Sequence, residues 1–182
     1  MLTRLFRKDR LAAPAAALQR ALVAQARQPA LYSVLGVADT LDGRFDATVL
    51  HAVLLFRRLQ TEGEAGAELS QRTFDLLFRS FDEGLRMIGT GDMTIGKKIG
   101  QMAEAFYGRS QAYLAALETG ESDALGDALI RNLYRGENPG QAALEACVGY
   151  VRAAAALLAS QPIGALLQGQ VQFPAPPRVL AA

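Results

Sequence analysis

Apolar residues recur every three or four positions along most of this chain, and no segment shows the strict alternation of a half-buried strand. This spacing places the apolar side chains of each segment on one face of an α-helix, which restricts the fold to packed helices. The clearest example is the segment Ser70–Ile88, whose stripe consists of Phe74, Leu77, Phe78, Phe81, Leu85 and Ile88. We therefore predict an all-α fold, a single-domain helical bundle of about six to seven helices.

Glycine and proline residues set the expected helix ends. The predicted helices span residues 14–27, 30–35, 44–60, 70–88, 92–119, 123–134, 139–160 and 163–168. Segment 44–60 is apolar on two faces, which predicts a buried, central position. Residues 61–67 contain two glycines and are expected to form a loop, and Gly84 and Gly108 are expected to lie against other helices. The expected helix caps are Asp42, Asp92 or Thr94, Ser122 and Asn138.

The composition divides the chain into three regions. Residues 1–12 form a basic amphipathic N-terminal segment, residues 13–168 the helical domain, and residues 169–182 a Pro-rich extended tail. The N-terminal segment lacks the features of a secretory signal, and no apolar run reaches the roughly 20 residues that span a bilayer. This segment is either a solvated terminus or a contact with an anionic membrane surface, made through Arg4, Arg7, Lys8 and Arg10.

The chain has 182 residues, a formal net charge of +1, one His and one Cys. A single His and a single Cys cannot build a Cys/His zinc site or an intrachain disulfide, and a nucleophilic relay would have to use His51. The small net charge also argues against a nucleic-acid binder. We therefore expect no enzymatic activity, no metal, no cofactor and no nucleic-acid partner.

One helix carries a charged stripe beside its apolar stripe. Its residues alternate in sign at spacings of three and four, and they are Arg72, Asp75, Arg79, Asp82 and Arg86. The order Asp75 to Arg79 and Asp82 to Arg86 favours i,i+4 ion pairs. The stripe is either a solvated, self-paired face or a surface whose ions pair with a partner protein.

His51 also allows two interpretations. Inside a mostly apolar helix it is either a core residue that is hydrogen-bonded to a neighbour, or a haem ligand in an all-α pocket. The neighbouring turn Asp39–Phe45 has too few oxygen ligands for a calcium loop. The segment Thr90–Lys98 lacks the pattern of a phosphate-binding loop.

Between Ala24 and Leu117 the chain carries a series of short motifs in a specific order. They include Asp42-Gly-Arg-Phe45, Leu50-His51, Arg57-Arg-Leu59, Phe74-Asp75, Gly91-Asp92 and Ala105-Phe-Tyr-Gly-Arg109. This order resembles the ubiquinol–cytochrome c chaperones, which are assembly factors for cytochrome b of the bc1 complex. The short N-terminal segment is similar to that of a bacterial-type member of this family.

The resemblance implies a non-enzymatic helical chaperone domain that binds newly made cytochrome b and assists assembly of the cytochrome bc1 complex. It implies a respiratory-chain role, a second assembly factor as a possible partner, and a peripheral place at the membrane. That place is the cytoplasmic side of the inner membrane in a bacterium, or the matrix side in a mitochondrion. The alternative function is a haem-binding or haem-modifying all-α protein that uses His51.

The resemblance and the charged stripe together indicate the residues that contact the client or a partner. The charged candidates would orient the client, and they are Asp39, Asp42, Arg44, Asp75, Arg79, Asp82, Arg86, Asp92, Lys97 and Arg109. Phe106 and Tyr107 would supply apolar contact.

Overall fold

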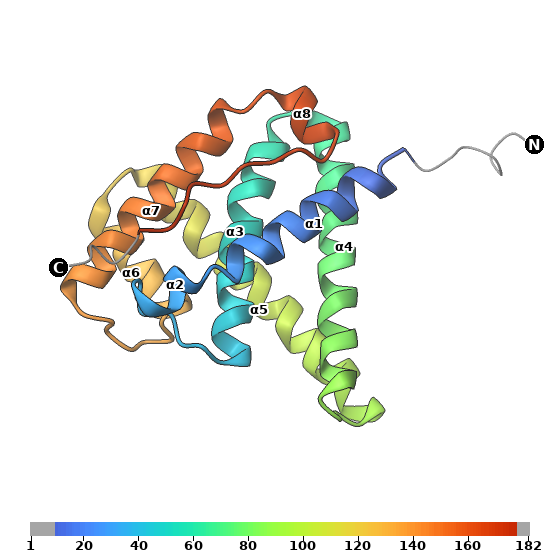
Figure 1. Ribbon diagram of the computed structural model, residues 1–182, viewed down its shortest axis with the longest axis horizontal. Coiled ribbons are helices and arrows are strands. Elements are labelled where there is room, and N and C mark those ends of the chain that lie inside the picture. The colour runs from blue at the N-terminus through green and yellow to red at the C-terminus, as the bar shows by residue number, and fades with distance from the viewer. Residues whose placement is uncertain (1–9, 178–182) are drawn as a thin grey trace, which may run out of the picture.

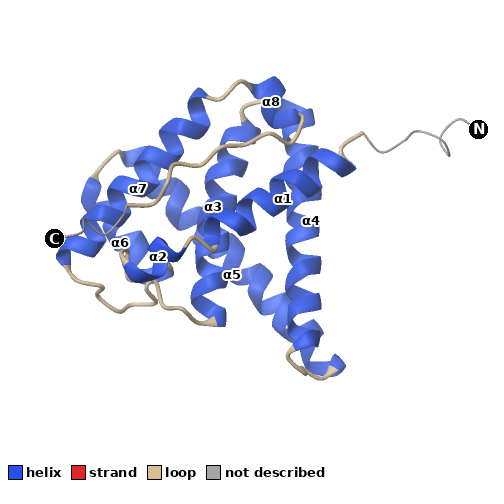
Figure 2. Cartoon of the chain, in the orientation of Figure 1, coloured by secondary structure: helices blue, strands red, loops and turns tan. Residues whose placement is uncertain are grey.

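The computed structural model describes residues 10–177, and within them the chain forms helices and no strand (Figures 1 and 2). The helices are α1 (Ala12–Ala26), α2 (Pro29–Ser33), α3 (Leu41–Gln60), α4 (Gly63–Met87), α5 (Asp92–Thr119), α6 (Ser122–Asn132), α7 (Gln141–Ser160) and α8 (Ile163–Leu167). The predicted all-α class is confirmed. Six of these helices have 11 residues or more, and α2 and α8 have five each.

Helix α3 lies at the centre of the fold, as its two apolar faces predict. It packs against α1, α4, α5 and α7, and Figure 1 shows α1 and α4 beside it with α5 crossing behind. Leu50, Leu54 and Leu55 of α3 are buried. Because both apolar faces of a helix must be covered, other long helices are arranged around it.

The predicted loop at residues 61–67 is wrong, because α4 already begins at Gly63. Gly63 has a φ of 60°, so the chain turns there within a few residues. A Cβ on Gly66 would overlap the carbonyl oxygen of Leu59 at the end of α3. The two glycines therefore allow a close crossing of α3 and α4 directly after a tight turn.

The helix caps also differ from the predictions. Thr40 caps α3, because its side chain accepts a hydrogen bond from the backbone N–H of Gly43 at 3.0 Å. Asp42 and Asp92 lie inside the first turns of α3 and α5, and their carboxylates form ion pairs with arginines instead. An ion pair with a guanidinium competes with the cap for the same oxygens.

The predicted caps Ser122 and Asn138 do not occupy the N-cap positions, whereas two predicted helix ends agree with the structure. Helix α6 begins at Ser122 itself, and the Asn138 side chain accepts a hydrogen bond from the N–H of Gly140, which precedes α7. The predicted stops at Gly36 and Gly120 are confirmed, since both residues have left-handed φ values, of 73° and 70°.

Helix α7 is long and apolar enough to cross a membrane by length and composition. In this fold it packs against α3 and α6, and its residues Tyr150 and Val151 are buried. A core helix of a globular domain has the same apolar composition, and these contacts are those of a core helix.

Residues 169–177 follow α8 without regular secondary structure and run back along the bundle (Figure 1). The side chain of Gln161 exchanges two hydrogen bonds of 2.8 Å with the backbone of Gln172. The Phe173 ring contacts the His51 ring edge-on, with 5.5 Å between the centroids. This part of the predicted extended tail therefore packs against the core.

We expect Gly66→Ala to lower the free energy of unfolding by about 1–3 kcal/mol, because the new methyl group overlaps the Leu59 carbonyl. Gly108 is the matched control. It lies inside α5 with open space around it, so the predicted close packing at Gly108, and likewise at Gly84, is wrong. Gly108→Ala should therefore stabilise the chain by about 0.5–1 kcal/mol. Urea unfolding followed by circular dichroism measures both changes, and equal effects of the two substitutions would contradict this account.

Candidate functional site

An open groove of about 760 Å³ lies between α1, α3, α4 and α5. Figure 1 shows how these helices are arranged, with α4 to one side of α3 and α5 crossing behind it. Its lining residues from α1, α3 and α4, with Arg27 just after α1, are Gln19, Val23, Arg27, Leu41, Asp42, Arg44, Phe45, Thr48, Ser80, Phe81, Gly84 and Leu85. The residues Lys98, Gln101, Met102, Ala105 and Arg109 of α5 and Arg135 from the loop after α6 complete the lining.

Part of the lining of the groove is apolar. Phe45 and Phe81 meet edge to face with 5.3 Å between their centroids, which joins α3 to α4. Val23, Leu85 and Met102 extend this apolar surface onto α1, α4 and α5. Ten of the eighteen lining residues are polar or charged, so the groove combines this apolar surface with a charged one.

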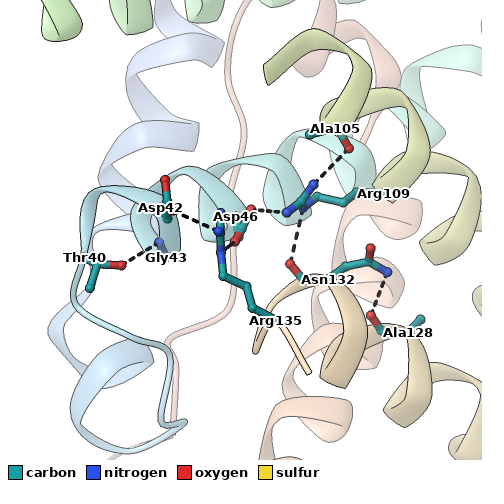
Figure 3. Close-up of polar contacts among 9 residues, drawn as sticks. All are labelled: Thr40, Asp42, Gly43, Asp46, Ala105, Arg109, Ala128, Asn132 and Arg135. Carbon is teal, nitrogen blue, oxygen red and sulfur yellow. Dashed lines mark hydrogen bonds and ion pairs between the residues drawn. The ribbon is translucent and has the colours of Figure 1, made fainter. Parts of the chain in front are cut away.

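The charged wall of the groove is built around Asp46, whose side chain is 0 % exposed. Its Oδ1 lies 2.9 Å from Nη2 of Arg109, and its Oδ2 accepts a hydrogen bond of 2.6 Å from Nε of Arg135 (Figure 3). Arg135 also donates from Nη1 to Asp42 at 2.9 Å. One buried carboxylate therefore joins α3 to α5 and to the loop after α6.

Contacts to the backbone hold Arg109 in place, and ion pairs hold Arg135. Arg109 donates hydrogen bonds of 3.3 Å to the carbonyl oxygens of Ala105 and Asn132, and its guanidinium lies 5.8 Å from the centre of the Phe45 ring. Arg135 adopts a left-handed φ of 57°, which is unusual for a residue with a side chain. The ion pairs with Asp46 and Asp42 stabilise this conformation.

Burial raises the pKa of the Asp46 carboxyl, and the hydrogen bond from Arg135 and the charge of Arg109 oppose that rise. The two guanidinium groups thus partly offset the effect of burial and favour the ionised form of the carboxyl. Removing either arginine would therefore favour the protonated form.

The structure places the predicted site residues in three different regions. Asp42, Arg44 and Arg109 line the groove, and Asp39 pairs with Arg44 at 2.7 Å at its edge. Figure 3 shows Asp42 and Arg109 on either side of Asp46.

A second region is the outer face of α4 and the turn into α5. Arg86 pairs with Asp82 at 2.7 Å and with Asp92 at 2.6 Å, so the predicted Asp82–Arg86 pair is confirmed. Asp75 accepts a hydrogen bond from Gln71 instead of pairing with Arg79. Arg79 and the neighbouring Lys97 are exposed.

The third region is an aromatic cluster on α4 and α5. The rings of Phe106 and Tyr107 lie 5.0 and 5.9 Å from that of Phe74, next to a second, smaller cavity of about 270 Å³. Phe106 is buried and Tyr107 is exposed. Of the basic N-terminal residues, Arg4, Arg7 and Lys8 lie outside the described residues, and Arg10 is exposed.

Sequence reasoning did not identify Asp46 or Arg135, which organise the groove. A signal for Asp46 was present, because it is a carboxylate immediately before the apolar run Ala47–Phe56 and needs a partner if that run is buried. The partner itself could not be found in this way. Arg135 lies in a polar turn near Gly136, which resembles an ordinary loop.

The interpretation of His51 as a hydrogen-bonded core residue is confirmed. Its Nδ1 donates to the carbonyl oxygen of Ala47, and its Nε2 accepts from the hydroxyl of Tyr150, both at 2.7 Å. The Tyr150 hydroxyl in turn accepts a hydrogen bond from Gln25. Burial lowers the pKa of His51 to about 4. Both ring nitrogens are engaged, so neither is free to ligate haem iron in this fold.

A helical domain whose distinctive feature is an open groove, with an apolar floor and a charged wall, belongs to the class of binding proteins. The family model described as ubiquinol-cytochrome C chaperone matches residues 33–173. The chain therefore belongs to the ubiquinol–cytochrome c chaperone family, and the resemblance found in the sequence motifs is confirmed.

A solved structure supports the same assignment. The crystal structure of the Cbp3 homolog from Brucella abortus is similar to this chain, with a TM-score of 0.81 and 32% sequence identity. The match covers 95% of this chain and 96% of the other. No curated protein matches the chain.

Asp46→Asn should lower the free energy of unfolding by about 3–5 kcal/mol, because it leaves two arginines beside a buried neutral amide. Asp39→Asn is the matched control, since its pair with Arg44 is exposed. Its unfolding curve should superimpose on that of the unaltered chain. Denaturant unfolding at pH 7 compares the two, and similar curves for both variants would show that the Asp46 network does not hold the fold.

His51 is the single histidine, so one imidazole resonance in a proton NMR spectrum reports its titration. Because its folded pKa is about 4, that resonance should stay at its neutral position until the pH approaches 4. The unfolded chain takes up this proton near pH 6.5, so the free energy of unfolding should fall between pH 6.5 and 4, by up to about 1.4 kcal/mol per pH unit. A titration midpoint near 6.5 in the folded protein would contradict the buried, bonded His51.

Proposed function

We propose that this protein is an assembly chaperone that binds newly made cytochrome b and assists biogenesis of the cytochrome bc1 complex. Membership of the ubiquinol–cytochrome c chaperone family supports the chaperone role and the assembly of this complex. The action is binding without catalysis. Its place is peripheral, at the cytoplasmic side of the membrane, where a membrane protein such as cytochrome b is inserted.

The observation that carries this proposal is the open groove with its apolar floor. A membrane protein exposes apolar segments until it is inserted and assembled, and these segments aggregate in water. Phe45, Phe81 and Met102 offer such a segment an apolar surface drawn from three helices. Methionine and the neighbouring open space allow segments of different shape to fit.

Exposed apolar residues near the groove extend this surface. Leu41 lines the groove and is 59% exposed. At the turn between α4 and α5, Met87 is 83%, Ile88 63% and Met93 98% exposed. Large apolar side chains gathered on one region of a folded surface indicate an interaction site. Together with the groove they form a surface suited to an unassembled membrane protein.

A photoreactive amino acid at Leu41 tests the proposal in cells that assemble bc1. We expect illumination to link the chaperone to cytochrome b, because position 41 lies in the groove and accepts a larger side chain without repacking. The matched control is Ala153, an exposed position of α7 outside the groove, which should give no such product.

A deletion strain provides the second measurement. Loss of the chaperone should reduce the amount of cytochrome b and of assembled bc1 complex in membranes, as seen in difference spectra. The proposed function is refuted by a strain that assembles normal bc1 together with the absence of any cytochrome b product at position 41.

A further inference from the structure

The charges of the groove do not balance. Five cations line it, namely Arg27, Arg44, Lys98, Arg109 and Arg135. Three of them are paired: Arg44 with Asp39, Arg109 with Asp46, and Arg135 with Asp42 and Asp46. Within residues 10–177, Arg27 and Lys98 have no carboxylate partner, and both side chains are exposed.

The groove thus carries an excess of positive charge. The whole chain carries a formal net charge of +1, whereas the groove and its paired carboxylates carry two cations in excess. Arg27 comes from the end of α1, and Lys98 comes from the first turns of α5, so the two cations approach the groove from different elements. An occupant that combines an apolar body with negative charge complements this surface.

The shape favours an elongated occupant. The apolar lining continues from Phe81 to Leu85 along α4, and one turn further lies the exposed Ile88. An apolar surface longer than the cavity fits a polypeptide segment with successive side chains, in the manner of a helix in a groove. The neutral polar residues of the lining are Gln19, Thr48, Ser80 and Gln101. The hydroxyls of Thr48 and Ser80 donate to the carbonyl oxygens of Arg44 and Leu77, so their oxygens can accept hydrogen bonds from such a segment.

We propose that the groove selects apolar client segments that carry a carboxylate side chain, with Arg27 and Lys98 as the cations that recognise it. This inference rests on the proposed chaperone function and names the chemistry of the segment that is bound. The apolar floor provides affinity for many apolar sequences. The two unpaired cations discriminate among them and accelerate encounter with an acidic segment.

Two labelled synthetic peptides test this selectivity with the purified full chain. Both are apolar helical segments of the same sequence, with Glu at the central position in one and Gln in the other. Fluorescence anisotropy should show that the Glu peptide binds about tenfold more tightly at low ionic strength. The ratio should fall as salt is added, because the cations are exposed and screened.

Substitutions locate the effect. In the double variant Arg27→Gln and Lys98→Gln the ratio of the two affinities should fall to about one, while the Gln peptide binds as before. The control removes the same charge from exposed positions outside the groove, as Arg20→Gln and Arg131→Gln, and should keep the ratio. Both double variants should melt at the temperature of the unaltered chain, since none of these four residues forms an ion pair or a side-chain hydrogen bond within residues 10–177.

Three results would overturn the inference. One is equal affinity for the two peptides, and another is a ratio that survives loss of Arg27 and Lys98. The third is binding of neither peptide. If a short-chain anionic phospholipid then binds, and binding needs both Arg27 and Lys98, the occupant of the groove is a lipid and not a polypeptide segment. The crosslinking at Leu41 is independent of these outcomes, so it still decides the proposed function.

Discussion

The buried carboxylate of Asp46 is the constraint on which the arrangement of the groove depends. A charge without exposed surface is costly by several kcal/mol unless it is paired and hydrogen-bonded. Arg109 of α5 and Arg135 of the loop after α6 meet this need from two separate elements. The demand of one carboxylate therefore fixes the position of α5 and of this loop relative to the central helix, and with it the charged wall of the groove.

The same ion pairs shape the chemistry of the groove. They neutralise the cations closest to the apolar floor and leave exposed positive charge at its edges. A floor of phenylalanine, leucine and methionine can hold many apolar segments without a single complementary shape. Exposed charges add discrimination and speed more than affinity. This combination suits a chaperone, which must hold a client and later release it.

The helical pattern predicted much of the fold, because helix formation and burial depend on neighbours three and four residues away. The central place of α3 and the stops at Gly36 and Gly120 followed from such local signals. The start of α4 was not predicted correctly. Two nearby glycines usually indicate a loop, but here Gly63 and Gly66 allow a close crossing of α3 and α4. The predicted caps at Asp42 and Asp92 were wrong for a similar reason, because the carboxylates of both residues form ion pairs with arginines from other parts of the chain.

The sequence by itself determined the all-α class, the buried central helix and the family, because periodicity and ordered motifs are local properties of the chain. It left two interpretations of His51, a bonded core residue or a haem ligand, and the contacts in the fold decided between them. Tertiary structure alone decided which charges are paired and which remain available. Asp46 and Arg135 are 89 positions apart, and Arg27 and Lys98 reach the same groove from the end of α1 and from α5. Ion pairing and charge excess depend on distances in space, and the spacing of residues along this chain does not contain them.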